Sequence, residues 1–421
     1  MGIRKLLRIL GPGLLYAGAA IGVSHLVQST RAGAGYGFDL IWILLLANIL
    51  KYPFFEFAPR YAAATGESLI QGYHRLGRWA IIAFAILTVA TMFTIQAAVT
   101  VVTAGIFANV FHLSVNTVML SALILTATVI ILMVGKYSVL DKLIKIVIII
   151  LALSTVVAVV SALSIYNARS GTEITHFNWS SETSILFLIA FIGWMPAPID
   201  VSVWSSLWNI EKARTLKERL TLRETLLDFR IGYIGTAIMA LCFLLLGALV
   251  MHGSGESLSS EGAAFAGQLI NMYTVSIGEW ARPVIALAAL TTMFSTTLTC
   301  IDAYPRVLLP TTRILAPKIP ETKSIDNKLY WLWILVVSAG ALILLRYFAT
   351  SMHYMVDVAT TLSFVTAPVL AWMNYRVVKQ SNVPANARPG MGLRIWSWFG
   401  IVFLSLFTVY YILWRMGILL I

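Results

Sequence analysis

Five charged residues lie within long apolar segments or at their ends, where a charge calls for a chemical explanation. They are Lys51, Glu56, Asp200, Asp302 and Asp357. A charged side chain at the centre of a bilayer costs about 2.5–3.5 kcal/mol unless a partner or water compensates it. Lys51 and Glu56 are five residues apart, about 140° around a helix, so they should contact neighbouring helices and not each other. We expect Lys51, Glu56 and Asp357 either to lock helices together or to act as gating or coupling charges.

Two of the apolar segments are interrupted near their middle. Residues 9–31 contain the run Gly22-Val23-Ser24-His25, and residues 185–208 contain Met195-Pro196-Ala197-Pro198. In lipid, backbone groups freed by a break must be satisfied by protein or water. Paired breaks in the two halves of a transporter mark its substrate site, so we expect a substrate cavity between them. The residues expected to line it are Gly22, Val23, Ser24, His25, Trp194, Met195, Ala197 and Asp200.

The side chains at the breaks allow more than one kind of chemistry. Asp200 follows the second break, so its carboxylate either caps the next half-helix or contacts a cation or an ammonium group. The His25 imidazole and the Met195 thioether could bind a soft metal ion, or His25 is held by hydrogen bonds alone. Trp194 is a candidate for the pocket wall. Arg31, at the outer end of its segment, should meet water.

The composition is that of a membrane protein. Of the 421 residues, 59% are hydrophobic and 11% are charged, whereas soluble proteins carry about 25% charged residues. The net charge of +12 would suggest nucleic acid in a soluble protein, but here the basic residues lie in short loops and set orientation. No hydrolase, metalloprotease or nucleotide-binding motif is present. We therefore expect no enzyme activity and no cofactor, and as partners the lipid bilayer and a small-molecule or ion substrate.

Eleven apolar segments meet the length of about 20 residues that a membrane span requires. They are residues 9–31, 38–64, 79–110, 116–135, 140–165, 184–208, 225–251, 279–303, 329–348, 353–376 and 395–419. If the N-terminal flank, residues 1–8, is cytoplasmic, most of the 30 lysines and arginines fall on the cytoplasmic side. The charge bias thus predicts a multi-pass protein, of a bacterial inner membrane, with a cytoplasmic N-terminus and an outer C-terminus.

Eleven spans divide into five, five and one. We predict a single transmembrane domain, residues 1–421, with one repeat at 1–165, a second at 184–376 and an additional helix at 395–419. The broken segments are then the first of each five. Because five is odd, the second repeat enters from the opposite side and is inverted. The predicted fold is all-α, a LeuT-type 5+5 inverted repeat with broken helices 1 and 6.

Several stretches resemble the Nramp family of divalent-metal transporters. They are Gly11-Pro12-Gly13, the run AGAGYG at residues 32–37, LLLAN at 44–48, TGE at 65–67, and Met195-Pro196. The resemblance extends through most of the first ten spans and is most specific over residues 32–69. It implies a LeuT-type fold and a cation pathway between the first and sixth helices.

The functional positions depart from that family's pattern. The family's metal-binding Asp-Pro-Gly-Asn falls on residues 22–25, and its sixth-helix histidines fall on Ala197 and Ser202. Its acidic pair in the third span falls on Met92 and Ile95. The change at residues 22–25 removes the carboxylate that attracts a dication. The change at Met92 and Ile95 removes the proton relay. The resemblance therefore implies a divergent member without the usual proton coupling.

Three functions remain open on this sequence. The first is secondary transport of a metal cation, divalent and able to keep its hydration shell where direct ligands are few. The second is transport of an organic solute such as an amino acid, or of a small anion. A break without an aspartate leaves the positive start of a half-helix free to meet a carboxylate. The third is a sensor that transports nothing.

Overall fold

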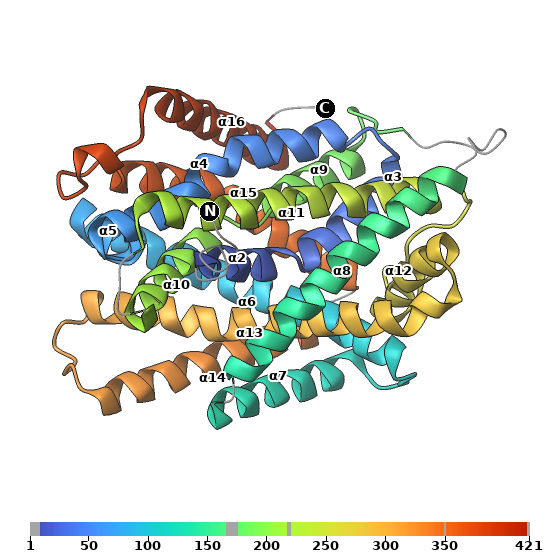
Figure 1. Cartoon of the computed structure of the whole chain (residues 1–421), viewed down its shortest axis with the longest axis horizontal. Helices are drawn as coiled ribbons and strands as arrows, with labels where there is room; N and C mark the ends of the chain where they lie inside the picture. Colours follow the sequence, from blue (N-terminus) through green and yellow to red (C-terminus); the bar gives the residue numbers. More distant parts are fainter. Residues whose placement is uncertain (1–8, 136, 166–175, 217–219, 349–350, 419–421) are drawn as a thin grey trace.

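The computed structural model describes residues 9–135, 137–165, 176–216, 220–348 and 351–418 (Figure 1). Side chains are described throughout these ranges except at residues 137–145, 147, 148 and 165. The predicted cytoplasmic flank at residues 1–8 and the predicted last residue of the final span, 419, lie outside this description.

Long helices make up most of the described chain, because apolar residues run through each of them with little interruption. In this part of the chain, eight helices are long and apolar enough to cross a membrane, the fifth of them including the 3₁₀ turn η2 (Glu279–Ala281). They are α4 (Ile41–Thr65), α6 (Arg78–Val110), α7 (Thr117–Val134), α11 (Leu222–Val250), α13 (Arg282–Leu315), α14 (Lys323–Tyr347), α15 (Met352–Val377) and α16 (Met391–Arg415). Each overlaps one of the eleven predicted spans.

The other three predicted spans are built differently. The first consists of α2 (Pro12–Ala20), the π-helical turn η1 (Ser24–Ser29) and α3 (Thr30–Tyr36). The sixth consists of α9 (Glu182–Trp194) and α10 (Val201–Leu216), separated by residues 195–200. The fifth is α8 (Tyr137–Ile165), which contains a shorter apolar stretch, Ile149–Ser164. The predicted all-α fold with broken first and sixth helices is confirmed.

Short elements connect the long ones. The helix α5 (Leu69–Leu76) starts at a capping box, in which Ser68 accepts from the Gln71 backbone N–H and the Gln71 side chain accepts from that of Ser68. The helix α12 (Gly262–Ile277) lies between α11 and α13 in the chain, and the 3₁₀ turn η3 (Ala385–Ala387) lies between α15 and α16.

The half-helices lie inside the bundle, and segments distant in sequence surround them. The helix α2 packs on α10, α11 and α13, and in Figure 1 it lies mid-view between α11 and α13. The helix α9 packs mainly on α15, and α10 mainly on α4. The ends of helices created by the breaks are therefore enclosed by protein, as broken helices in a membrane require.

Both halves of the first broken helix touch α11 backbone to backbone. A Cβ added at Gly13 in α2 would lie 2.1 Å from the carbonyl oxygen of Asp228. A Cβ added at Gly33 in α3 would lie 1.9 Å from the carbonyl oxygen of Leu244. Only glycine allows these approaches. The Asp228 carboxylate also accepts hydrogen bonds from the backbone N–H groups of Gly11 (3.0 Å) and Gly13 (2.7 Å), which holds the start of α2 on α11.

Candidate functional site

A small cavity lies between the two breaks. Its volume is about 20 Å³, which is room for about one water molecule. Four elements or their junctions supply its wall: the first broken helix, α6, the second broken helix and α13. The lining residues are Ala19, Ala20, Val23, Ser24, Ile95, Val99, Trp194, Ala197, Pro198, Val201, Trp204, Thr296 and Cys300.

Four of the eight residues predicted to line the site belong to this wall: Val23, Ser24, Trp194 and Ala197. The wall is mostly apolar, and these polar groups already have partners. The Ser24 hydroxyl lies 2.6 Å from a carbonyl oxygen in the last turn of α2. The indole N–H of Trp194 donates to the Ser363 hydroxyl of α15 (2.8 Å), which fixes the ring.

The other four predicted residues, Gly22, His25, Met195 and Asp200, lie outside this wall. Gly22 sits directly behind it, since a Cβ there would lie 2.9 Å from the side chain of Thr296. The Met195 side chain is fully buried. The structure therefore brings the two breaks together, but it does not gather all eight side chains around one position.

His25 is bonded through both ring nitrogens. Its Nε2 lies 2.9 Å from the carbonyl oxygen of Thr236 in α11, and its Nδ1 lies 2.7 Å from the Ser24 hydroxyl. A carbonyl oxygen only accepts, so Nε2 carries a proton and donates. The fully buried ring thereby joins η1 to α11. Of the two alternatives for His25, this arrangement corresponds to the one in which hydrogen bonds alone hold the ring.

Asp200 is buried beside the cavity. None of the side chains in the described part of the chain donates a hydrogen bond to its carboxylate, which is faced by the backbone N–H groups of Asp200 itself and Val201. Asp200 lies near Cys300, in the cavity wall, and near Tyr304, whose buried hydroxyl has no hydrogen-bond partner among the described residues. A buried carboxylate without a cationic partner is costly, so a positive group of a ligand would gain most at this position.

Lys51 brings a charge of the opposite sign to the second break. Its side chain is fully buried, and Nζ donates to the carbonyl oxygens of Ile192 (2.6 Å) and Gly193 (2.9 Å). These carbonyl groups belong to the last turn of α9, which carries the negative end of the helix dipole and has few intrahelical partners. The ammonium group thus occupies oxygen atoms that a bound cation would otherwise use.

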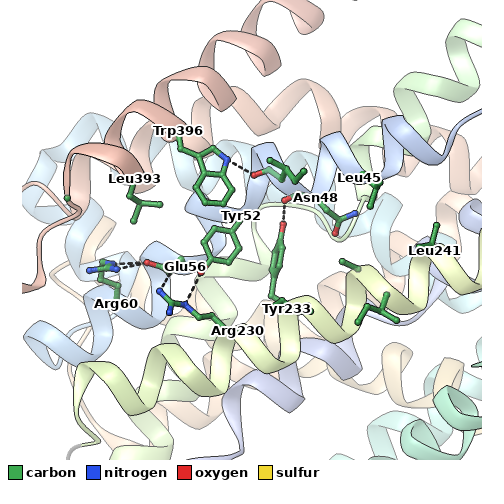
Figure 2. A pocket seen from close by; sticks show the side chains of 15 residues that line it. Leu45, Asn48, Tyr52, Glu56, Arg60, Arg230, Tyr233, Leu241, Leu393 and Trp396 are labelled. Carbon is green, nitrogen blue, oxygen red and sulfur yellow. Dashed lines mark hydrogen bonds and ion pairs between the residues drawn. The ribbon is translucent and has the colours of Figure 1, made fainter.

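Glu56 is held in an ionic cluster between α4 and α11. It accepts from Arg60 Nε (3.1 Å) and Nη2 (2.5 Å), and from Arg230 Nη2 (3.5 Å). The hydroxyl of Tyr52 also donates to it. Figure 2 shows these side chains converging on the Glu56 carboxylate. Glu56 and Lys51 therefore contact different neighbouring helices, as their separation around α4 predicted.

Asp357 closes the other end of the first broken helix. Arg31 in α3 makes a bidentate pair with it, with N–O distances of 2.7 and 3.1 Å, and Gln28 in η1 donates to it (3.1 Å). The Arg31 guanidinium also lies 5.0 Å from the ring centre of Phe187 in α9. Arg31 was expected to meet water. Its side chain is 15% exposed and borders a hollow, while most of it is covered by protein. A paired arginine and aspartate can share a partly buried position that neither charge would tolerate alone.

Larger hollows lie on both sides of the central cavity. One, of about 940 Å³, is bordered by α2, α5, α10 and α13 and includes Asp302, which is bonded to Arg306 (2.7 Å) and Tyr330 (2.5 Å). Trp208 lines this hollow, and Trp204 lines the central cavity. The two rings meet edge to face, 6.4 Å apart. The other hollow, of about 490 Å³, is lined by Arg31 and residues of the α11–α12 connection. The Trp204–Trp208 pair thus lies between the central cavity and the hollow beside Asp302.

Several wall residues were not predicted from the sequence. Ile95 and Val99 come from α6, and Thr296 and Cys300 come from α13. For Ile95 a signal existed, because one of the acidic positions of the Nramp pattern falls on it. For α13, the only hint was a threonine-rich run, residues 291–299. These wall positions carry an apolar side chain (Ile95) and a hydroxyl group (Thr296), and none of the lining residues is a carboxylate that could relay protons or bind a metal ion.

Comparison with known proteins agrees with this architecture. A family model described as "Natural resistance-associated macrophage protein-like" (Nramp) matches residues 13–414. The uncharacterized protein PM0681 of Pasteurella multocida is 39% identical over 412 residues, 97% of this chain and 92% of that protein. The manganese transporter of Eremococcus coleocola superposes with a TM-score of 0.63 at 12% identity, over 97% of this chain and 87% of that one. MhsT in complex with L-phenylalanine superposes with a TM-score of 0.60 at 14% identity, over 94% and 98%.

Proposed function

Because this chain belongs to the Nramp family, we propose that it is a secondary transporter whose cargo passes between the two broken helices. The observation that carries this proposal is the meeting of both breaks at one small cavity with a larger hollow on either side. Transporters with broken helices hold their cargo at such a position and open to one side at a time. A sensor that transports nothing has no comparable support.

The proposed cargo is a metal cation, divalent and hydrated. Family membership supports a metal, but among the described residues no group of three or more His, Cys, Asp or Glu side chains could hold one directly. The cavity has room for about one water molecule and would have to widen for a hydrated ion. Backbone carbonyl oxygens and the Ser24 hydroxyl would then contact the ion's water molecules, so that fewer direct ligands are needed. The predicted ligand pair of His25 and Met195 would require His25 to release Ser24 or Thr236. Apolar Met92 and Ile95 support transport without the family's proton relay.

An organic solute is the second candidate, favoured by the chemistry of the cavity wall. Trp194 and Trp204 give it an aromatic surface. Lys51 already occupies two carbonyl oxygens at the second break, and within the described ranges Asp200 is a carboxylate without a cationic partner. An amino acid would present an ammonium group to Asp200 and an apolar side chain to the tryptophans.

Thermal unfolding of the purified full-length protein, with a panel of divalent ions, amino acids and small anions, separates the two candidates. The metal proposal expects stabilisation by at least one divalent ion, and uptake of that ion into proteoliposomes. Stabilisation and uptake of an amino acid or an anion, with no response to any metal, would overturn it in favour of the second candidate. Stabilisation by a ligand that is not taken up into proteoliposomes would instead indicate a sensor that transports nothing.

We further propose a cytoplasmic N-terminus, an outer C-terminus and a bacterial inner membrane, from the charge bias between loops. In this orientation the hollow beside Asp302 opens to the cytoplasm, and the Arg31–Asp357 pair lies on the outer side. Single cysteines at Ser180 and at Lys323, labelled from outside in intact cells, test this. Labelling of residue 180 alone is expected, and labelling of residue 323 alone would reverse the orientation.

A further inference from the structure

A groove away from the breaks opens between α4, α11 and α16 (Figure 2). Its volume is about 680 Å³, within the usual range for pockets that bind small molecules. Its walls are mainly apolar, and Ile49, Ile234 and Ile238 in them are each more than half exposed. Since these helices are long enough to span a membrane, the groove opens toward lipid.

One end of the groove is charged. Glu56, Arg60 and Arg230 all line it, which gives two positive charges against one negative charge. The Arg60 and Glu56 side chains are 11% and 2% exposed, whereas that of Arg230 is 51% exposed. Arg230 uses Nε for Tyr52 and one N–H of Nη2 for Glu56. Of its five N–H donors, three have no partner among the described residues.

At this charged end, Arg230 lies in the first half of α11. Arg230 is the ninth residue of α11, so it lies about 12 Å from the start of that helix. In the proposed orientation α11 starts on the cytoplasmic side. Anionic lipids are concentrated in cytoplasmic leaflets, and basic pockets between membrane helices bind their headgroups.

The apolar part of the groove has a rigid wall. The Trp396 ring of α16 stacks on Tyr52 of α4, with ring centres 5.0 Å apart, and its indole N–H donates to the carbonyl oxygen of Ile49 (2.8 Å). Figure 2 shows Trp396 and Leu393 on one side of the groove and Tyr233 and Leu241 on the other. The groove is thus shaped before any ligand arrives, which reduces the entropic cost of binding.

We propose that this groove binds one anionic phospholipid, with an acyl chain between α11 and α16 and the phosphate at Arg230. A transmembrane helix of a partner is too large for it. A helix about 10 Å wide that rises 1.5 Å per residue would fill 680 Å³ with roughly six residues. The excess positive charge selects an anionic headgroup over a zwitterionic one. The lipid would join α16, which lies outside the two repeats, to the transport core.

The test measures thermal stabilisation of the full-length protein in detergent by phosphatidylglycerol and by phosphatidylcholine with the same acyl chains. Phosphatidylglycerol is expected to stabilise more, and at lower concentration. Arg230→Gln is expected to raise the phosphatidylglycerol concentration for half-maximal effect about fivefold, the value of one basic residue at a membrane surface. Ala237→Phe, which fills the apolar part of the groove, is expected to weaken the stabilisation by both lipids.

Arg223→Gln is the matched control, because Arg223 is an exposed arginine in the first turn of the same helix and does not line the groove. It should leave the lipid response unchanged. Equal stabilisation by the two lipids would overturn the proposal. So would an equal loss of the response to phosphatidylglycerol in Arg223→Gln and Arg230→Gln. Glycerol phosphate, which has no acyl chains, is tested as a third ligand beside the two lipids. If it matches phosphatidylglycerol, the groove binds a soluble anion and not a lipid.

Discussion

The Nζ atom of Lys51 lies 2.6 Å from the carbonyl oxygen of Ile192, and the two residues are 141 positions apart in the chain. The bond joins α4, in the first predicted repeat, to the last turn of α9, in the second. It holds a fixed positive charge at the break through which we propose that the cargo passes. The charge repels a dication and attracts a carboxylate, so its removal separates the candidate functions.

Lys51→Met is expected to raise the affinity for a divalent ion about tenfold or more, because it removes the repelling charge in a medium of low dielectric constant. The same change should lower the affinity for an amino acid or an anion. Ligand-dependent thermal shifts measure both effects. Lys51→Arg keeps the charge and serves as the control. A divalent-ion affinity that is unchanged in Lys51→Met would mean that the ammonium group only caps α9.

Asp200→Asn is expected to weaken the binding of any cargo that carries a positive charge, because this buried carboxylate beside the cavity has no cationic partner among the residues that the structure describes. Folding stability should be unchanged or should rise by up to about 1–3 kcal/mol, since a buried charge is replaced by an isosteric neutral amide. Binding and denaturant unfolding are measured on the same sample. Unchanged transport and affinity would identify Asp200 as a helix cap alone.

Asp357→Asn is expected to loosen the outer end of the first broken helix, because it removes the bidentate pair with Arg31. A cysteine at Thr360, a fully buried position, should then react about tenfold faster with a membrane-impermeant thiol reagent, which corresponds to about 1.4 kcal/mol. The native cysteines are both buried. Glu279→Gln, which breaks an exposed pair with Arg282, should leave the rate unchanged.

Gly33→Ala is expected to destabilise the protein by about 1–3 kcal/mol, because the new methyl group meets the Leu244 carbonyl oxygen and forces α3 and α11 apart. Gly35→Ala on the same helix is the control, since a Cβ there meets no atom within 4 Å. Unfolding in denaturant compares the two variants. Equal stabilities would show that the helices can separate at little cost.

Glu67, in the connection between α4 and α5, links stability to pH. Arg75 donates two hydrogen bonds to its carboxylate (2.8 and 2.5 Å), and these bonds lower the pKa of Glu67 below its ordinary value of 4.5. The stabilisation is therefore complete above the unfolded-state pKa and is lost as the pH falls through the lowered folded-state pKa. The melting temperature should fall more steeply below about pH 4.5 in the wild type than in Glu67→Gln. Parallel curves would contradict this.

Hydropathy alone was sufficient to predict the spans, because each long helix must present about 20 apolar residues to lipid. The breaks were also predictable, because the run at residues 22–25 and the Pro-Ala-Pro run at 196–198 interrupt the first and sixth segments. Isolated prolines in α4, α13 and α15 leave those helices continuous. The 3.6-residue helical period separated Lys51 from Glu56 correctly. These features depend on neighbours in sequence, and the structure agrees with each of them.

The partners of the charges were not predictable, because they come from distant parts of the chain. Arg31 was expected in water, yet Asp357 is 326 residues away in sequence and directly beside it in space. The two bonds of His25 likewise depend on how η1 packs against α11. A sequence pattern specifies which face of a helix is polar, but only the packing decides which neighbour that face meets.

The close contacts at Gly13 and Gly33 limit which parts of the molecule can move. Both halves of the first broken helix are fitted against the backbone of one continuous helix, α11, near its start and near its end. Bending at the break would have to separate one of the two contacts, so α2, α3 and α11 should travel together as one rigid body. The moving surfaces are then the contacts of this body with α4, α8, α10 and α13, together with the Arg31–Asp357 pair to α15. Alternating access in this protein would be a rocking of the whole unit, with the helix break serving as a binding surface and not as a hinge.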